Sequence, residues 1–383
     1  MEVAGINRMN SRIGNQNLIL ALNSGSSSLK FGLFRAGAND EEPVLSGSAD
    51  GIGRKSGSFR IRASDGSLLV QRNDILESQD DALAAIGEAI SAHAQSTPTA
   101  VGHRVVHGGP WLRTHQIITP QVLGELRSAT HFAPLHIPQA LKLIASAQAN
   151  FPGAKQYACF DNAFHKTIPE VAAHFPLPQR LFDLGIQRYG FHGLSYESLV
   201  HQLGSDLPQR AIFAHLGNGA SLCALRNGIS IDTTMGLTPT GGIPMGTRSG
   251  DLDPGVLIYL MRNEKLDADA LEAMLNHESG LLGLSSGESD VKALEVRTRG
   301  NDPHAALALN IFAVSVRKMI GAYTALLGGV DLLVFAGGIG EHSDYVRSAA
   351  TAGLEAIGLT KDKIRVLAAQ EEIQIARHCR ALL

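Results

Sequence analysis

The sequence predicts an α/β protein built from two related domains. A glycine- and serine-rich turn between two apolar runs begins near residue 23 and again near residue 217, and this pattern is typical of a β-hairpin. Segments with apolar residues at three- and four-residue spacing fill the intervals and indicate amphipathic helices. A chain of 383 residues exceeds the length at which a single core stops growing, which favours more than one domain.

Composition argues against a nucleic-acid-binding protein and against a membrane-spanning one. The 33 basic and 36 acidic residues give a net charge of −3, without the basic excess that holds a nucleic-acid backbone. The longest apolar stretch, 305–316, is too short to cross a bilayer, so no membrane span is expected. Residues 1–16 are polar and unlike a secretory signal, which predicts a disordered leader of a cytoplasmic protein. Three widely spaced cysteines predict buried, reduced thiols.

The expected elements alternate along the chain. The first hairpin has strands at 18–22 and 29–34, and the second has strands at 211–216 and 222–225. Further strands are predicted at 101–106, 157–160 and 330–335. Helical spacing covers 80–94, 139–149, 305–327 and 343–357. The two hairpin turns could therefore face each other across a cleft between the domains.

Three turns have the composition of nucleotide-binding loops. In the first, Ser26 and Ser28 offer hydroxyl and backbone donors, and Lys30 adds a positive charge. It lacks the P-loop pattern, and a simple turn is the alternative interpretation. The glycines of 217–219 let backbone approach phosphate oxygens closely. Residues 337–340, Gly-Gly-Ile-Gly after an apolar strand, suit a base or ribose lying against backbone.

Two arginines stand in segments that favour anion binding. Arg104 lies in an apolar strand and Arg248 in a loop of small residues, and the planar guanidinium fits carboxylate and phosphate oxygens. A structural ion pair of Arg248 with Asp251 or Asp253 is the alternative. Asp161 follows an apolar strand, where a catalytic carboxylate and an ordinary helix cap are both frequent.

Two loop histidines could donate to anionic oxygens. They are His136, in Pro-Leu-His-Ile-Pro, and His192, in Tyr-Gly-Phe-His-Gly. His103 and His107 have the spacing of a helical metal pair, but the valines around them predict a strand instead. Taken one at a time, each of these histidines could be purely structural.

In combination these segments resemble the acetate kinase family, within the superfamily of acetate and sugar kinases, chaperones and actin. The matching segments run in family order over the chain after the leader: NSGSSSLK from Asn23, VGHRVVHGG from Val101, PLH from Pro134, FDNAFHKTIP from Phe160, RYGFHG from Arg188, HLGNGAS from His215, MGTRSGDLDP from Met245, ESGLLGLS from Glu278 and AGGIGEHS from Ala336. The resemblance implies two duplicated actin-like, ribonuclease H-like α/β domains with a nucleotide cleft between them. The expected division is 17–160 plus about 372–383 for the first domain and 161–371 for the second.

The resemblance also implies an activity and roles for individual residues. The expected reaction is reversible, Mg²⁺-dependent phosphoryl transfer from ATP to acetate, giving acetyl phosphate and ADP, in a homodimer. Mn²⁺ is an alternative ion. The implied nucleotide contacts are Ser26, Ser28, Lys30, His215, Leu216, Gly217, Asn218, Gly219, Asp290, Val291, Lys292, Gly338, Ile339, Gly340, Glu341 and His342. The implied catalytic residues are Asp161, Arg104, Arg248, His192 and His136. Asn23 and Glu371 would support the metal, and Arg104, Val106, Leu135, Phe191 and Pro239 would receive the acid.

The carboxylate of the acid substrate is already ionised at neutral pH and has no proton for Asp161 to abstract. Asp161 is therefore expected to position other groups.

Several residues depart from the family pattern: Ile137, Asn162, Lys292 and His342, together with residues beside Pro239 and before Glu371. Propionate or a longer acid is therefore an alternative to acetate. A nucleotide-gated binding protein of the same superfamily is the alternative from another class.

Overall fold

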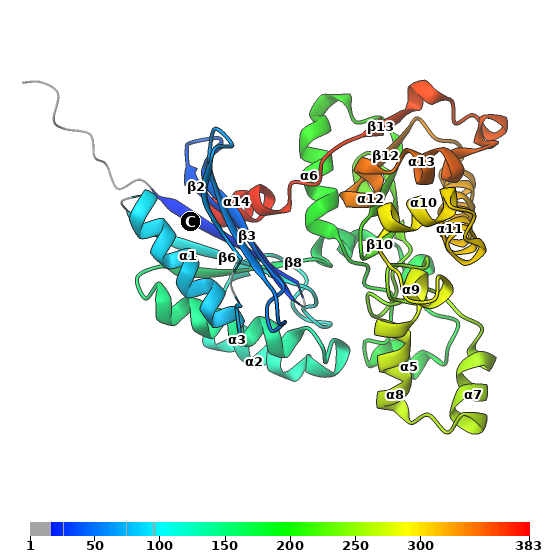
Figure 1. Cartoon of the computed structure of the whole chain (residues 1–383), viewed down its shortest axis with the longest axis horizontal. Helices are drawn as coiled ribbons and strands as arrows, with labels where there is room; N and C mark the ends of the chain where they lie inside the picture. The colour runs from blue at the N-terminus through cyan, green and yellow to red at the C-terminus, as the bar shows by residue number, and fades with distance from the viewer. Residues whose placement is uncertain (1–16, 26, 74, 95) are drawn as a thin grey trace, which may run out of the picture.

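Two β-sheets, each flanked by helices, form the two lobes of this computed structural model, which describes residues 17–25, 27–73, 75–94 and 96–383 (Figure 1). The leader expected at 1–16 lies outside the described residues. The first sheet has the order β5-β4-β3-β2-β1-β6-β8-β7. Its strands are β1 Leu18–Ser24, β2 Ser28–Ala36, β3 Glu41–Asp50, β4 Ser58–Ala63, β5 Leu68–Arg72, β6 Ala100–Val105, β7 Gln116–Ile117 and β8 Lys155–Phe160.

The alternation of side chains along β1 explains the layers around the first sheet. Leu18, Leu20 and Leu22 pack with helices α1 (Gln79–His93) and α3 (Ile137–Asn150) on one face. Ile19 and Ala21 point to the other face, where they meet α14 (Glu371–Leu382). A third helix, α2 (Pro120–Ser128), packs against α3. The last helix of the chain therefore lies against the first strand (Figure 1).

The second sheet repeats the arrangement of the first. Its order is β11-β10-β9-β12-β13, with β9 Arg210–Leu216, β10 Ala220–Arg226, β11 Ile229–Thr233, β12 Leu332–Ala336 and β13 Ile364–Val366. Strand β9 is antiparallel to β10 and parallel to β12. In the same way, β1 is antiparallel to β2 and parallel to β6. The two predicted hairpins are confirmed, and each opens a sheet with the same local topology.

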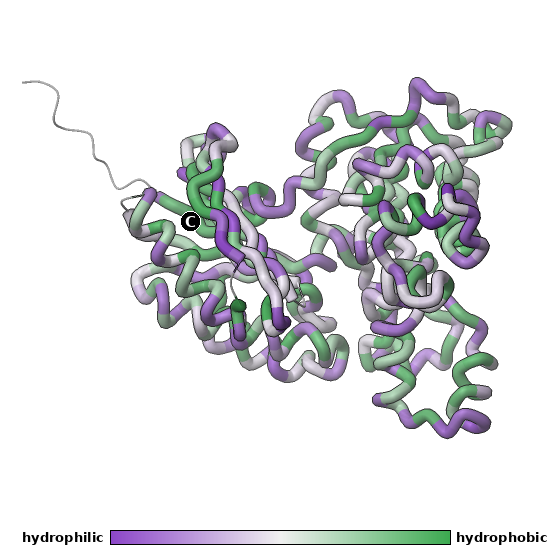
Figure 2. Tube along the Cα trace, in the orientation of Figure 1, coloured by the Kyte–Doolittle hydropathy of each residue, from purple (hydrophilic) through white to green (hydrophobic). Residues whose placement is uncertain are grey.

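Helices cover both faces of the second sheet as well. Ile212 and Ala214 of β9 pack with α11 (Pro303–Leu327), and Ala211 and Phe213 pack with α6 (Gly193–Leu203). The other helices of the described chain are α4 Glu170–Ala173, α5 Gln179–Asp183, α7 Pro254–Asn263, α8 Ala268–Ala273, α9 Gly280–Leu284, α10 Val291–Arg299, α12 Gly337–His342 and α13 Asp344–Thr351. Hydrophobic stretches run through both lobes (Figure 2). Cys159, Cys223 and Cys379 are buried free thiols, as expected.

Two sequence-based expectations needed correction. The helix expected at 343–357 ends at Thr351, because the chain turns at Gly353 (φ 78°) into a 3-10 turn at Leu354–Ile357. The glycine-rich turn after β12 is itself helical, since α12 begins at Gly337.

Helix α11 is longer than the apolar stretch on which the membrane expectation rested. By length and composition alone it is the one described helix that could cross a membrane. Its residues Leu309, Phe312 and Val316 lie in the hydrophobic core of the second lobe. That placement is typical of a core helix.

Candidate active site

A cleft of about 1160 Å³ receives side chains from both lobes. The β1–β2 hairpin contributes Ser28 and Lys30, and the β9–β10 hairpin contributes 217–219. The cleft is also lined by these other residues singled out in the sequence: Asn23, Arg104, Val106, His136, Asp161, Phe191, His192, His215, Pro239, Arg248, Asp290, Val291, Lys292, Gly338, Ile339, Glu341, His342 and Glu371. The structure thus gathers segments that are far apart in sequence around one space.

Four sequence-predicted contacts do not line this cleft or cannot be placed. Ser26 lies outside the described residues. Leu216 is fully buried in the core of the second lobe, and Gly340 packs against Phe335. Leu135 is 39% exposed and is not part of the cleft lining.

Arg104 and Asp161 form an ion pair within the cleft lining. Arg104 lies on β6, and Asp161 directly follows β8, the parallel neighbour of β6. Arg104 donates to Asp161 Oδ2 from Nε at 2.8 Å and from Nη2 at 2.5 Å, and from Nη1 to Asn23 Oδ1 at 3.1 Å. Asp161 Oδ1 is buried without a hydrogen-bond partner. Asp161 therefore does not cap a helix, and its side chain fixes the guanidinium of Arg104.

Burial and neighbouring charges set the protonation of this pair. Burial raises the pKa of Asp161 to about 6, and Arg104 only partly opposes the increase. For Arg104, burial lowers the pKa, but the charges of Asp161 and Glu371 outweigh burial and raise it. At neutral pH the pair is therefore a carboxylate and a guanidinium.

His192 is held in a backbone conformation that non-glycine residues rarely adopt, with φ 60° and ψ 22°. The residues on either side are anchored. His165 Nε2 donates to the Phe191 carbonyl at 3.0 Å, and the Gly193 N–H donates to the Asp161 carbonyl at 2.8 Å. A Cβ at Gly193 would lie 2.3 Å from that carbonyl oxygen, so the close approach requires glycine. These contacts tie the position of His192 to the end of β8.

Two imidazoles stack beside the second hairpin. The ring centroids of His192 and His215 are 4.3 Å apart with an interplanar angle of 29°. Each ring has its Nδ1 2.8 Å from a serine hydroxyl, Ser221 for His192 and Ser195 for His215. Burial first, and then the nearby His215 and arginines, hold the pKa of His192 well below its usual value. His192 is therefore neutral at physiological pH.

Arg248 enters the cleft with no carboxylate of the described residues within ion-pair distance. Its Nη1 donates to the Pro239 carbonyl at 3.1 Å. Asp251 and Asp253 instead accept from the backbone N–H groups of Gly242 and Gly255. The alternative interpretation of Arg248 as part of a structural ion pair is therefore wrong.

His136 also lines the cleft, at the start of α3. Burial, followed by Arg248 and Arg104, lowers the pKa of His136 to about 4. Like His192, His136 is a neutral donor or acceptor at physiological pH. The cleft thus combines two cationic arginines with two neutral imidazoles.

Glu371 and Glu372 bring two carboxylates together beside Asn23, and their oxygen atoms suit a divalent cation. Asn23 Nδ2 donates to Glu371 Oε2 at 2.8 Å and to Glu372 Oε1 at 2.9 Å. Carboxylate and amide oxygens are the hard ligands that Mg²⁺ prefers. The two carboxylates therefore fit the implied ion, whereas Asn23 turns its amide nitrogen toward them and its oxygen toward Arg104. Glu372 was not singled out in the sequence, although the two adjacent acidic residues in the first turn of α14 were a signal for it.

Two implied nucleotide contacts also hold the backbone in place. Glu341 Oε1 accepts from the N–H groups of Gly337 and Ala369. Asp290 caps α10 by accepting from Ala293 N–H at 2.8 Å. Both residues also line the cleft. Glu341 holds the turn next to Gly338, and Asp290 holds the start of the helix that carries Lys292.

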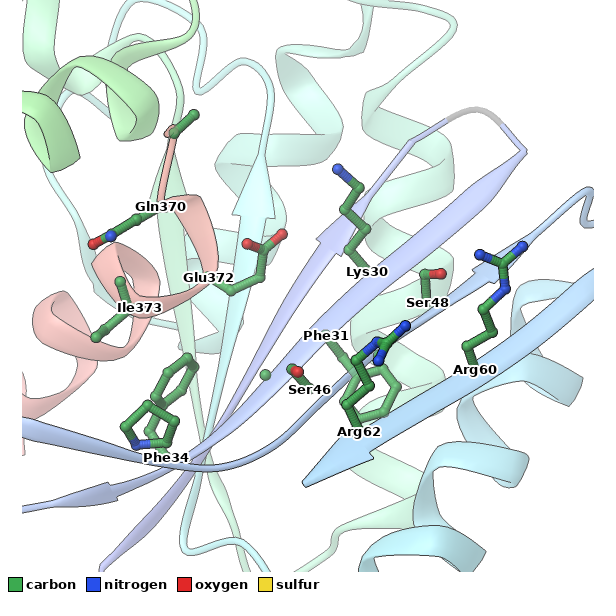
Figure 3. A pocket seen from close by; sticks show the side chains of 14 residues that line it. Lys30, Phe31, Phe34, Ser46, Ser48, Arg60, Arg62, Gln370, Glu372 and Ile373 are labelled. Carbon is green, nitrogen blue, oxygen red and sulfur yellow. The ribbon is translucent and has the colours of Figure 1, made fainter. Parts of the chain in front are cut away.

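A second hollow, of about 570 Å³, adjoins the cleft between strands β2–β4 and the start of α14 (Figure 3). Lys30, Ser48 and Arg60 stand opposite one another across these strands. Lys30 and Glu372 line both spaces. Sequence analysis did not single out this hollow, because it depends on which strands pair.

Comparisons with known proteins agree with this arrangement. The family model of the Acetokinase family matches residues 18–378. An acetate kinase from Methylocella silvestris is 40% identical over 400 residues, covering 95% of this chain and 98% of the relative. One from Clavibacter michiganensis subsp. michiganensis is 42% identical over 359 residues, covering 91% and 89%.

Solved structures match as well. The acetate kinase of Porphyromonas gingivalis superposes with a TM-score of 0.83 at 32% identity, covering 96% of this chain and 99% of that one. A propionate kinase from Francisella tularensis gives a TM-score of 0.88 at 33% identity, covering 96% and 100%. The expected fold of two actin-like α/β halves is thereby confirmed. By sequence and structure together, the chain belongs to the acetokinase family.

Proposed function

We propose that this protein transfers a phosphoryl group directly between ATP and acetate, forming acetyl phosphate and ADP. The observation that carries the proposal is the placement of Arg104, His192 and Arg248 on one cleft that the two hairpin loops also line. Arg248 lacks a carboxylate partner among the described residues, so its charge is available to an anion. A binding protein whose cleft only opens and closes with nucleotide would not need these three side chains.

The reaction brings two anions together. The acid is already ionised, so the site needs no base to activate it. Arg104, oriented by Asp161, would hold the carboxylate. Arg248 and a neutral His192 would donate to oxygens of the migrating phosphoryl group, whose charge they stabilise.

The nucleotide would lie between the hairpins. Ser28, Lys30 and 217–219 would meet its phosphates, and Lys292, Gly338 and His342 would lie nearer its base and ribose. Asn23, Glu371 and Glu372 would hold Mg²⁺, directly or through water. When bound, the ion offsets phosphate charge and helps align the phosphates.

The size of the acid is set by the apolar part of the cleft wall. Val106, Phe191 and Pro239 line it, and a small apolar pocket excludes long chains by volume. Leu135 lies outside the lining, so the pocket has one wall residue fewer than the resemblance implies. Propionate is therefore the second candidate acid, and a propionate kinase is among the similar structures.

The test is trapping of acyl phosphate as hydroxamate with Mg·ATP and formate, acetate, propionate, butyrate or isobutyrate. We expect the highest kcat/KM with acetate, and at least a hundredfold loss of kcat in Arg248→Ala, the usual size for loss of a transition-state donor. A maximum at propionate would change the substrate. ATP hydrolysis without hydroxamate for every acid would favour the nucleotide-gated binding protein.

The same cleft leads to a proposal about domains and closure. We propose that 17–160 with about 372–383, and 161–371, move as two domains that close around nucleotide, because loops of both must reach one triphosphate. An unchanged radius of gyration by X-ray scattering with a bound transition-state mimic would contradict closure. A homodimer and a cytoplasmic location stay predictions from the resemblance, and light scattering tests the first.

A further inference from the structure

We infer that Tyr196 and Ser221 act as positioning residues that fix the tautomer of His192, so that its Nε2 carries the ring proton and faces the reacting phosphoryl group. This inference rests on the proposed function for its catalytic meaning. Its structural basis is a chain of three buried side chains. Ser221 and Tyr196 are completely buried, and His192 is 8% exposed.

The two ring nitrogens of His192 face different surroundings. Nδ1 is 2.8 Å from Ser221 Oγ, on strand β10 behind the cleft. Nε2 lies toward the second hairpin loop: a methyl group placed at Gly219 would be 3.2 Å from it and 3.4 Å from Arg248 Nη1. Nε2 therefore points to the part of the cleft where Arg248 is available to an anion.

Counting protons leaves one arrangement that satisfies every buried group. Ser221 Oγ is also 2.5 Å from the Tyr196 hydroxyl. If Tyr196 donates to Ser221 and Ser221 donates to His192 Nδ1, the histidine proton is on Nε2. The reverse direction would put the histidine proton on Nδ1. It would also leave the tyrosine proton without an acceptor. Among the described residues the other partner of that hydroxyl is the His215 backbone, which lowers the pKa of Tyr196 and is therefore an N–H donor.

Burial sets the protonation of both Tyr196 and His192. Burial, and then the nearby Cys223, raises the pKa of Tyr196 well above 10, so the phenol keeps its proton. His192 has a single ring proton, because burial and the surrounding cations lower its pKa. The network therefore has three protons for two internal hydrogen bonds, and the third proton is directed into the cleft.

The tautomer decides whether His192 attracts or repels the substrate. An Nε2–H group donates to a phosphoryl oxygen, whereas an unprotonated Nε2 presents a lone pair to it. Tyr196 and Ser221 touch neither the substrate position nor Arg248 in the cleft lining. They act through His192, so their loss should lower kcat more than it changes the KM for either substrate.

The direct test is the nitrogen-15 NMR spectrum of the histidine rings in the full-length protein without substrate, with the His192 signals assigned by their loss in His192→Gln. We expect the Nε2–H pattern in the wild type. Tyr196→Phe, which removes the terminal donor, and Ser221→Ala should both convert His192 to a mixture or to Nδ1–H. A wild-type Nδ1–H pattern, or an unchanged pattern in both variants, would overturn the inference.

Kinetics provide the second measurement. Tyr196→Phe and Ser221→Ala should each lower kcat by about tenfold to a hundredfold. The upper end of this range approaches the 10²–10³ loss that is typical when one preorganised donor is removed. Ser221→Thr, which keeps a hydroxyl, should restore most of the loss. Tyr157→Phe is the matched control, because the buried Tyr157 hydroxyl has no partner and lies on β8. It should change neither the spectrum nor kcat.

The two readouts separate this inference from the proposed function. If the wild type forms no acyl phosphate from any acid, the proposed function fails while the tautomer pattern can still hold. If the enzyme is active but the variants keep the wild-type tautomer, the inference alone fails. Thermal melting shows whether each variant is folded, and Ser221→Thr remains informative if Ser221→Ala is not.

Discussion

Arg104 binds one oxygen of Asp161, at 2.8 and 2.5 Å, while the other oxygen of the same buried carboxylate has no partner. The carboxylate thus orients the guanidinium with one oxygen, and its second oxygen stays buried without a partner.

Asp161→Asn removes the charge that orients Arg104. Breaking one partner of a buried pair leaves the other uncompensated, at a cost of about 3–5 kcal/mol that neighbouring Glu371 reduces here. We expect kcat to fall about a hundredfold and the KM for acetate to rise, measured by hydroxamate formation. Near-normal turnover would remove Asp161 from the mechanism.

The raised pKa of Asp161 predicts an acidic limb in the pH profile. Because the folded pKa of about 6 exceeds the ordinary value of 3.8, the ionised carboxylate costs stability above pH 6, and that cost disappears as the pH falls toward 3.8. Activity should change in the opposite sense. As pH falls through about 6, Asp161 becomes neutral, its hold on Arg104 weakens, and kcat/KM should fall with one proton. The residual activity of Asp161→Asn should lack this limb.

Gly219→Ala places a methyl group at the reacting end of the cleft. The added carbon would lie 3.2 Å from His192 Nε2 and 3.4 Å from Arg248 Nη1, where the substrate needs access. We expect at least a tenfold loss of kcat with little change in melting temperature. Gly124→Ala on α2 is the control, because nothing lies within 4 Å of its added carbon. That change should leave kcat unaltered and add about 0.5–1 kcal/mol of stability.

Glu371→Gln should raise the Mg²⁺ concentration needed for half-maximal activity by about tenfold or more, because it removes a charged oxygen from the candidate ligand set. The measurement is a Mg²⁺ titration of acyl phosphate formation at fixed ATP. Glu42→Gln is the matched control, since Glu42 pairs with Arg35 in an exposed part of the first lobe. An equal Mg²⁺ dependence in both variants would contradict the assignment.

Among the described residues, His115, Glu197 and His378 form the one group of three histidine, cysteine or acidic side chains whose ligand atoms lie close enough together to hold a metal ion. His115 Nδ1 accepts from the Phe160 N–H at 3.1 Å, so its proton is on Nε2, facing Glu197. A ligating nitrogen must be free of its proton, and we therefore expect no change in melting temperature with Zn²⁺. A rise with Zn²⁺ that Glu197→Gln abolishes would show a metal site.

The same Glu197 should instead stabilise the fold by linking α6 to α14. Burial raises its pKa, but the hydrogen bonds from His115 and His378 outweigh burial and lower the pKa to about 2. Its stabilisation should therefore be complete above about pH 4.5 and be lost as pH falls toward 2. Glu197→Gln should lower the free energy of unfolding at pH 7 by about 2 kcal/mol in denaturant titrations. An unchanged unfolding midpoint would contradict this role.

The local patterns of the sequence determined both hairpins, the helices at 80–94 and 305–327, and the motifs that identify the family. Side-chain periodicity and turn composition act between near neighbours, so they are readable in one dimension. The same reasoning failed at 343–357, where apolar spacing continued past the turn at Gly353.

Only the tertiary structure decided how the cleft is assembled. The bonds of Arg104 to Asn23 and Asp161, of Asn23 to Glu372, and of His192 to Ser221 join residues that no local spacing relates. They form because β6 pairs with β8, α14 returns to β1, and α6 packs beside β9. Hydrogen bonds and burial depend on distance in space, and the paired strands set those distances.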